Sequence, residues 1–166
     1  MKLRIAGLAD DSVVDGDGCR FTIFVQGCPH NCPHCQNPDT HDFNGGYETD
    51  TELIWEKIQA NPLLSGITFS GGEPLCQPVP LTQLAKQAHA AGLDVWCYTG
   101  SILEELTARR DADIDALLEE VDVLVDGPYI HERKDLTLRF RGSGNQRVID
   151  LKQTREKGRI VLCYDD

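Results

Sequence analysis

The feature that most constrains this chain is a set of three cysteines within a stretch that cannot form a regular helix or strand. Cys28, Cys32 and Cys35 have the spacing C-x3-C-x2-C and directly follow an apolar segment. The surrounding residues 27–46 also hold Gly27, Pro29, Pro33, Pro38, Gly45 and Gly46. Proline lacks the backbone donor that helices and sheets need, and glycine pairs favour turns. We therefore expect a metal centre to hold this loop.

The spacing of the three cysteines allows two kinds of metal centre. Three thiolates on one short loop can bind three irons of a cubane [4Fe-4S] cluster and leave the fourth iron without a protein ligand. A zinc site is the alternative, with His30 or His34 as the fourth ligand. Structural zinc sites usually combine two separated pairs of ligands, whereas these residues lie on a single loop. The spacing favours the cluster and leaves zinc open.

The cysteine count also bears on the compartment. The chain has seven cysteines, an odd number, whereas a secreted disulfide framework would pair them. No run approaches the roughly 18 apolar residues of a membrane span, and the first residues read as a strand rather than a signal peptide. We therefore expect a cytoplasmic protein. The four remaining cysteines have no short mutual spacing and are expected to pack as small apolar groups: Cys19, Cys76, Cys97 and Cys163.

The charge is strongly negative and unevenly distributed. Sixteen basic and 27 acidic residues give a net charge of -11, which argues against binding to a nucleic-acid backbone. Residues 131–160, however, carry 9 basic and 4 acidic side chains, a local charge of +5. A basic segment on an acidic body predicts either a contact surface, on the segment 131–166, or a solvated tail.

The order of predicted elements indicates one α/β domain spanning residues 1–166. Strands are predicted over residues 3–8, 20–26, 66–70, 93–98 and 121–125, and helices over residues 81–91, 102–109 and 114–120. A further helix begins at Thr49-Asp50-Thr51-Glu52, which has a capping signature. Strands that alternate with helices pair in parallel through right-handed crossovers.

The length of the chain limits the architecture. A complete eight-fold barrel needs about 250 residues, so 166 residues fit a partial, open (βα) barrel of about five to six parallel strands. The functional site is then expected at the carboxyl ends of the strands. A doubly wound sheet is the alternative, because periodicity alone does not separate the two.

A second motif supports the cluster interpretation. Ser70-Gly71-Gly72-Glu73-Pro74 follows a predicted buried strand, one helix after the cysteines. Glycines permit close backbone approach, and a strand-end carbonyl or carboxylate accepts hydrogen bonds from an ammonium group. Together the two motifs resemble the radical S-adenosylmethionine (SAM) superfamily. In that superfamily the open iron binds SAM, and the GGEP segment receives its methionine amino group.

Four further segments narrow the resemblance. VDGDG at residues 14–18, YTG at 98–100, VLVDGPY at 123–129 and RFRGSGNQRVI at 139–149 are similar to the activating proteins of anaerobic, class III ribonucleotide reductases. The likeness extends from about residue 8 to residue 151. It implies an enzyme that cleaves SAM reductively and generates a glycyl radical on the reductase.

The resemblance also implies roles for individual residues. It makes Cys28, Cys32 and Cys35 the cluster ligands and the centre of catalysis. The cofactor-binding residues that it implies are His34 and Gln36 at the adenine, Gly71, Gly72 and Glu73 at the methionine end, and Thr99 and Asp126 at the ribose or methionine. The partner contacts are expected at Arg139, Arg141, Gly142 and Ser143, on the wall where a glycyl loop would enter.

The implied cofactors are the [4Fe-4S] cluster and SAM, and the implied partners are the large subunit of the reductase and a one-electron donor such as flavodoxin. Three alternatives stay open at this point. The chain could activate another glycyl radical enzyme, act on a small molecule by radical SAM chemistry, or be a zinc-binding interaction module.

Overall fold

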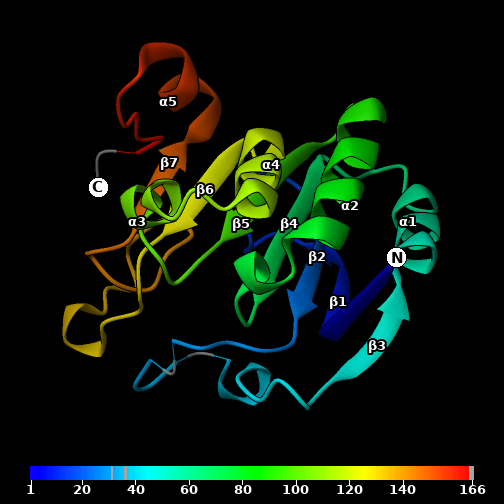
Figure 1. Ribbon diagram of the computed structural model, residues 1–166, viewed down its shortest axis with the longest axis horizontal. Coiled ribbons are helices and arrows are strands. Elements are labelled where there is room, and N and C mark those ends of the chain that lie inside the picture. The colour runs from blue at the N-terminus through cyan, green and yellow to red at the C-terminus, as the bar shows by residue number, and fades with distance from the viewer. Residues whose placement is uncertain (31, 36, 165–166) are drawn as a thin grey trace.

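The computed structural model describes residues 1–30, 32–35 and 37–164, and its strands form one mixed sheet in the order β3-β1-β2-β4-β5-β6-β7 (Figure 1). The strands are β1 (Lys2–Ser12), β2 (Arg20–Val25), β3 (Tyr47–Asp50), β4 (Gly66–Gly71), β5 (Asp94–Tyr98), β6 (Val123–Asp126) and β7 (Arg147–Asp150).

The helices of the described residues are short. The α-helices are α1 (Thr51–Gln59), α2 (Pro78–Ala90), α3 (Leu103–Ala108), α4 (Ala112–Glu120) and α5 (Leu151–Lys157), and the 3-10 turns are η1 (Pro38–Thr40), η2 (Pro74–Cys76) and η3 (His131–Arg133). None of these helices has the length and apolar character needed to cross a membrane.

The open α/β architecture predicted from the sequence is confirmed, with one difference in strand direction. Strands β2, β4, β5 and β6 run parallel to one another, which is fewer than the expected five to six. β1 is antiparallel to β2 because a short loop joins them, and β7 returns antiparallel to β6 at the other edge. The parallel core therefore spans four strands, flanked by antiparallel ones.

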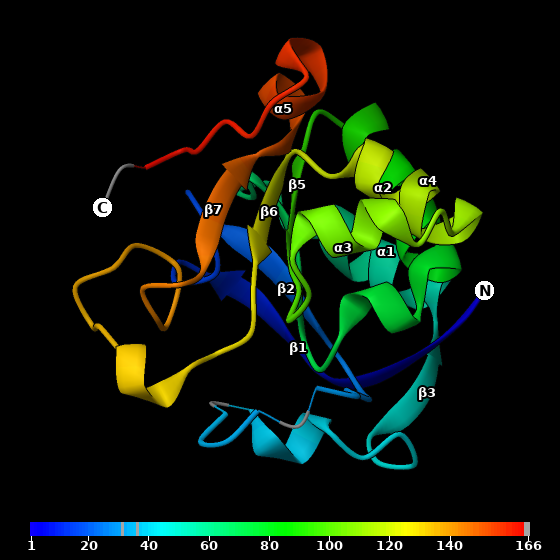
Figure 2. The ribbon, with the colours of Figure 1, turned by 60° about the vertical axis from the view of Figure 1, so that its left-hand side comes forward.

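The two faces of the sheet have different environments, which excludes the doubly wound alternative for the described residues. Helices α1 to α4 lie on one face, whereas loops and the C-terminal segment lie over the other (Figure 2). Side chains alternate accordingly. One row of paired residues, Ile23, Phe69 and Cys97, faces the helices within the main core, while the next row includes Thr22 and Thr68 on the opposite face. That second face carries buried polar groups and borders the site.

Local sequence signals explain the start of α1. The helix predicted at residues 49–52 is present. Its cap is Asp50, whose side chain accepts a hydrogen bond from the Glu52 amide at 3.2 Å. The other predicted strands and helices are present with shifted ends. The elements β3, β7 and α5 were not predicted, because each is short and gives a weak periodic pattern.

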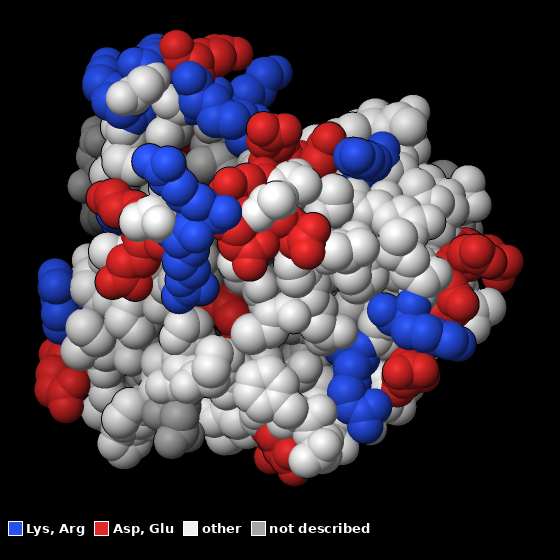
Figure 3. All heavy atoms as spheres, in the orientation of Figure 1, with Lys and Arg blue, Asp and Glu red and all other residues white. Residues whose placement is uncertain are grey.

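The basic C-terminal segment divides into two parts. Residues 127–146 form a loop near the cluster loop, whereas α5 lies at the opposite end of the sheet in both views (Figures 1 and 2). The basic side chains over α5 gather at the upper left of Figure 3, where the exposed residues are Lys152, Arg155, Lys157 and Arg159. After α5 the chain returns along the outer edge of β7, where the Cys163 amide donates to the Val148 carbonyl at 2.8 Å.

Candidate active site

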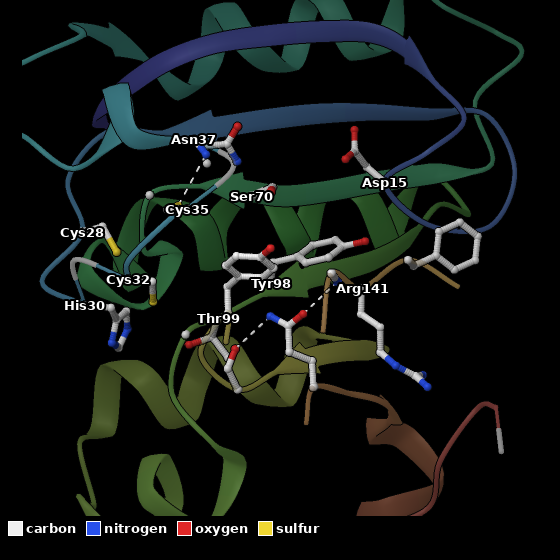
Figure 4. Close-up of a pocket in the computed structure, with 18 of the residues that line it drawn as sticks. Asp15, Cys28, His30, Cys32, Cys35, Asn37, Ser70, Tyr98, Thr99 and Arg141 are labelled. Carbon is white, nitrogen blue, oxygen red and sulfur yellow. Dashed lines mark hydrogen bonds between the residues drawn. The ribbon is translucent and has the colours of Figure 1, made fainter. Parts of the chain in front are cut away.

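A cavity of about 590 Å³ lies at the carboxyl ends of the parallel strands. This volume is in the range of small-molecule sites. Cys28, Cys32 and Cys35 line one end, and Asp15 and Arg141 lie at the other (Figure 4). The structure therefore brings the cysteine loop, the GGEP turn, the ends of β5 and β6 and the loop 127–146 to one cavity.

Hydrogen bonds position the loop that carries the cysteines. The Gly27 amide donates to the Thr40 carbonyl at 2.7 Å, and the Cys28 amide donates to the His41 carbonyl at 3.2 Å. The Asn37 amide donates to the sulfur of Cys35 at 3.4 Å. Such N–H···S bonds stabilise a thiolate ligand. The loop is thus held at both ends while its three sulfur atoms face the cavity.

The two histidines that a zinc site would use have other contacts. His30 Nε2 lies 2.6 Å from Glu73 Oε1. His34 has a left-handed backbone (φ +59°), and its ring stacks on that of His131 with centroids 4.2 Å apart. Among the described residues, no three His, Cys, Asp or Glu side chains converge on a single ion. A cubane places each thiolate on a different iron and needs no such convergence, so the donor set fits a cluster.

Three of the other cysteines are poor candidates for thiolate ligands. Burial raises the pKa of the Cys76 and Cys163 thiols to about 11. Burial also raises the pKa of Cys97, which is fully enclosed in the core. A raised pKa makes the thiolate harder to form, and the thiolate is the form that binds metal.

The GGEP turn presents backbone to the cavity. Gly71 has φ +97°, and a Cβ there would lie 2.6 Å from the Val25 amide nitrogen. A Cβ on Gly72 would collide with the carbonyl oxygen of Gly27, in the residue before Cys28. Only glycine fits at both positions, so the turn packs directly against the start of the cysteine loop.

Glu73 lies behind this turn rather than in the cavity lining, and its side chain is 3% exposed. Its Oε1 accepts from Thr99 Oγ1 at 2.8 Å and from the Gly100 amide at 2.9 Å, and it lies 2.6 Å from His30 Nε2. The hydrogen bond to Glu73 raises the pKa of His30, and burial opposes this rise. The GGEP carboxylate is thus enclosed by protein donors.

The far wall of the cavity depends on a buried arginine. Arg20 is 0% exposed and donates to Thr68 Oγ1 at 2.7 Å, to the Ile67 carbonyl at 2.8 Å and to the Asp17 carbonyl at 2.8 Å. Thr68 in turn donates to the carbonyl of Asp15 at 2.8 Å. The guanidinium therefore anchors the acidic loop, residues 13–18, whose Asp15 lines the cavity.

The two strand-end residues expected at the ribose or methionine lie in different places. Thr99 lines the cavity, with its hydroxyl bonded to Glu73. Asp126 is fully buried beneath it. The Asp126 carboxylate accepts from Arg147 at 2.6 and 3.0 Å and from the Leu103 amide at 2.9 Å. This carboxylate ties β7 and α3 to β6, while the next residue, Gly127, reaches the cavity.

Of the remaining predicted residues, only some line the cavity. Arg141 and Gly142 line the cavity. Arg139 lies over the ring of Tyr164 at 4.8 Å, and Ser143 is buried, where its hydroxyl accepts from the Ile130 amide. Gln36 lies outside the described residues.

Sequence reasoning did not assign several residues that line the cavity, among them Tyr98, Asp15 and Asn37. Tyr98 occupies the middle of the cavity, and burial, with the charge of Asp15, raises the pKa of its phenol. Asp15 was noted only within a similar segment. Asn37 contacts Cys35 through its backbone, which no side-chain pattern reveals. The YTG segment gave a signal for Tyr98, because it directly precedes the predicted Thr99.

Comparisons with known proteins give the same assignment. A family model described as a 4Fe-4S single cluster domain matches residues 14–149. The anaerobic ribonucleoside-triphosphate reductase-activating protein of Salmonella typhimurium is 38% identical over 148 residues, which cover 84% of this chain and 94% of that protein. The chain belongs to this family of activating proteins. The Escherichia coli K12 member of the family is 37% identical over the same shares.

A further relative matches a shorter part of the chain. The pyruvate formate-lyase-activating enzyme of Clostridium pasteurianum is 39% identical over 95 residues, 54% of this chain and 40% of that enzyme. Membership of the activating-protein family makes the chain a radical SAM enzyme with a [4Fe-4S] cluster and SAM as its cofactors. The zinc-binding alternative is thereby excluded.

Proposed function

We propose that this chain activates the anaerobic ribonucleoside-triphosphate reductase by generating a glycyl radical on it. The observation that carries the proposal is the single cavity that joins Cys28, Cys32 and Cys35 to the glycine turn and to Arg141. The activating-protein relatives match nearly their whole length, which supports this reductase as the partner. We place the reaction in the cytoplasm.

We assign roles to the predicted cofactor residues as follows. Cys28, Cys32 and Cys35 hold the cluster, and the backbone of Gly71 and Gly72 meets the methionine end of SAM. His34 and Gln36 are assigned to the adenine, and Thr99 borders the ribose. Since His34 stacks on His131, its contact with adenine requires the two rings to separate or the adenine to approach the outer face of the pair.

Cys28, Cys32 and Cys35 would hold the cluster, which would supply the one electron that splits SAM into methionine and a 5′-deoxyadenosyl radical. That radical would take a hydrogen atom from a glycine Cα of the partner and become 5′-deoxyadenosine. The chain holds the reacting groups close together and keeps bulk water away. Val14, Leu138 and Phe140 supply apolar wall beyond the cysteines. Tyr98, whose phenol remains protonated, separates the cysteine end from Asp15.

We propose that the glycyl loop of the reductase enters beside the loop 127–146. Arg141 and Gly142 line the cavity there, and Arg139 and Ser143 flank them. A guanidinium at this place can bond backbone carbonyls or a carboxylate of the entering loop. The helix α5 lies at the other end of the sheet from this loop (Figure 1). A flavodoxin-like protein is the proposed one-electron donor.

The test is formation of the glycyl radical under anaerobic conditions. The reconstituted chain is mixed with SAM, a flavodoxin-like donor and the reductase, and the radical is measured by electron paramagnetic resonance. Pyruvate formate-lyase replaces the reductase in a parallel sample, because the Clostridium relative makes that enzyme the second candidate partner. We expect a radical on the reductase only. A radical on pyruvate formate-lyase alone would show that the partner is wrongly assigned.

A further inference from the structure

The carboxylate of Glu73 is buried next to the cluster loop. Four hydrogen bonds surround it: Oε1 bonds His30, Thr99 and the Gly100 amide at 2.6 to 2.9 Å, and Oε2 accepts from the Leu75 amide at 3.1 Å. A carboxylate that is 3% exposed is stable only when it is paired and fully hydrogen-bonded. His30 is the one partner among these described groups that can carry a positive charge.

These bonds join three separate parts of the cavity. His30 lies between Cys28 and Cys32 on the cluster loop, Glu73 belongs to the GGEP turn, and Thr99 and Gly100 directly follow β5. These segments are in close contact, because a Cβ on Gly100 would lie 2.5 Å from the His30 ring. The Glu73 amide also donates to the Gly27 carbonyl at 2.8 Å. The cysteine loop and the glycine turn therefore have a fixed relative position.

We propose that His30 is a positioning residue for SAM binding, which acts through Glu73 to hold the Gly71–Gly72 turn in register with the cysteine loop. The proposal rests on the function proposed above. Glu73 is then an internal anchor, and the cavity-lining backbone of the turn meets SAM. Loss of His30 removes one of the four hydrogen bonds that hold this buried carboxylate, so the carboxylate rotates toward solvent and the turn follows it.

The proposal predicts a loss of SAM affinity that exceeds any loss of cluster. His30→Phe removes the hydrogen bond to Glu73, and His30→Gln keeps a side-chain donor at this position. After anaerobic reconstitution, we expect His30→Phe to raise the Kd for SAM at least tenfold, the scale typical of groups that orient a ligand shell. We expect His30→Gln to recover most of this affinity, and iron content to stay near that of the wild type in both variants.

A matched control lies at the opposite end of the strands. His89, in the last turn of α2, bridges Glu120 and Asp122 at 2.9 and 2.8 Å, and Asp122 directly precedes β6. His89→Phe removes a histidine–carboxylate bridge of the same kind, at a site away from the cavity. We expect this variant to lose stability and to bind SAM with unchanged affinity.

Two results would overturn the proposal. One is a wild-type Kd for SAM in His30→Phe. The other is additive losses in His30→Phe and Glu73→Gln, because residues that act through one contact must couple.

Amide hydrogen exchange of the cluster-free chain tests the proposal independently of cofactor binding. If His30→Phe does not take up a cluster, the Gly100 amide, which donates to Glu73, must still exchange faster than in the wild type. Unchanged exchange there contradicts the proposal. A wild-type chain that binds no SAM contradicts the proposed function instead, and leaves this exchange test intact.

Discussion

Replacement of Arg20 by methionine is expected to destabilise the chain strongly. Methionine keeps much of the side-chain length and removes the donors. Three bonds to Thr68, Ile67 and Asp17 are lost, at 2.7 to 2.8 Å. The bond to Asp94 at 2.6 Å adds little, because that carboxylate is 47% exposed and water screens the pair.

The magnitude follows from these contacts. Three charge-assisted bonds contribute about 1.5 kcal/mol each, and the apolar methionine side chain returns about 1 kcal/mol, so the free energy of unfolding falls by about 3–4 kcal/mol. For a chain of this size, that loss lowers Tm by roughly 6–16 °C. The acidic loop that Arg20 anchors should become accessible to proteases at the same time.

The assay is urea unfolding of the cluster-free chain, which separates stability from cofactor content. Arg155→Met is the matched control, because Arg155 also bonds carbonyls, those of Leu118 and Val121 at 2.9 and 3.3 Å, from an exposed position. We expect that variant to lose no more than about 1 kcal/mol. Equal losses in the two variants would refute the reasoning that burial of Arg20 sets the magnitude.

Three further predictions concern the cluster, the partner and pH. Single serine substitutions at the three loop cysteines should each abolish iron retention, whereas Cys163→Ser should retain about four irons per chain. Arg141→Ala should leave the iron content and Tm unchanged but lower the glycyl radical yield by roughly tenfold or more. Lys57→Ala serves as the exposed control. An unchanged radical yield in Arg141→Ala would exclude Arg141 from the partner site. Burial lowers the pKa of His89, whereas its hydrogen bonds to Asp122 and Glu120 raise it, and the net shift is upward. The stability that protonated His89 contributes is therefore present below about pH 6.5 and is lost as the pH rises through the raised pKa. The difference in unfolding free energy between wild type and His89→Gln should therefore be larger at about pH 6 than at pH 9, and a constant difference would contradict the assignment.

The sequence predicted the parts of the fold that local chemistry determines. Two local motifs predicted residues that line one end of the cavity: the spacing of Cys28, Cys32 and Cys35, and the glycines of the GGEP turn. Each motif depends on residues close in sequence. Apolar and β-branched runs located the parallel strands. β7 was missed, since four residues give no clear period and its pairing with β6 depends on a long intervening loop.

Long-range contacts explain what the sequence did not reveal. The stacking of His34 on His131 joins residues 97 positions apart, and no local pattern encodes it. Glu73 follows a strand, where a carboxylate can face a ligand or an internal donor equally well, and only the positions of His30 and Thr99 decide between them. Arg20 is a further case, because arginine is rarely buried without partners and its partners lie in three other segments.

The basic segment is a further feature whose place in the fold the sequence did not reveal. Its charge predicted either a contact surface over residues 131–166 or a solvated tail, but the fold places residues 127–146 beside the cavity and α5 at the far end of the sheet. Net charge along the sequence identifies a distinct segment without giving its geometry.

The most direct test of the proposed reaction follows a hydrogen atom from the partner to SAM. The reductase is labelled with glycine that carries deuterium at Cα and is then activated anaerobically by this chain with SAM and a one-electron donor. The account predicts one deuterium in the 5′-deoxyadenosine formed for each glycyl radical. Formation of 5′-deoxyadenosine without deuterium, at a yield independent of the reductase, would contradict it.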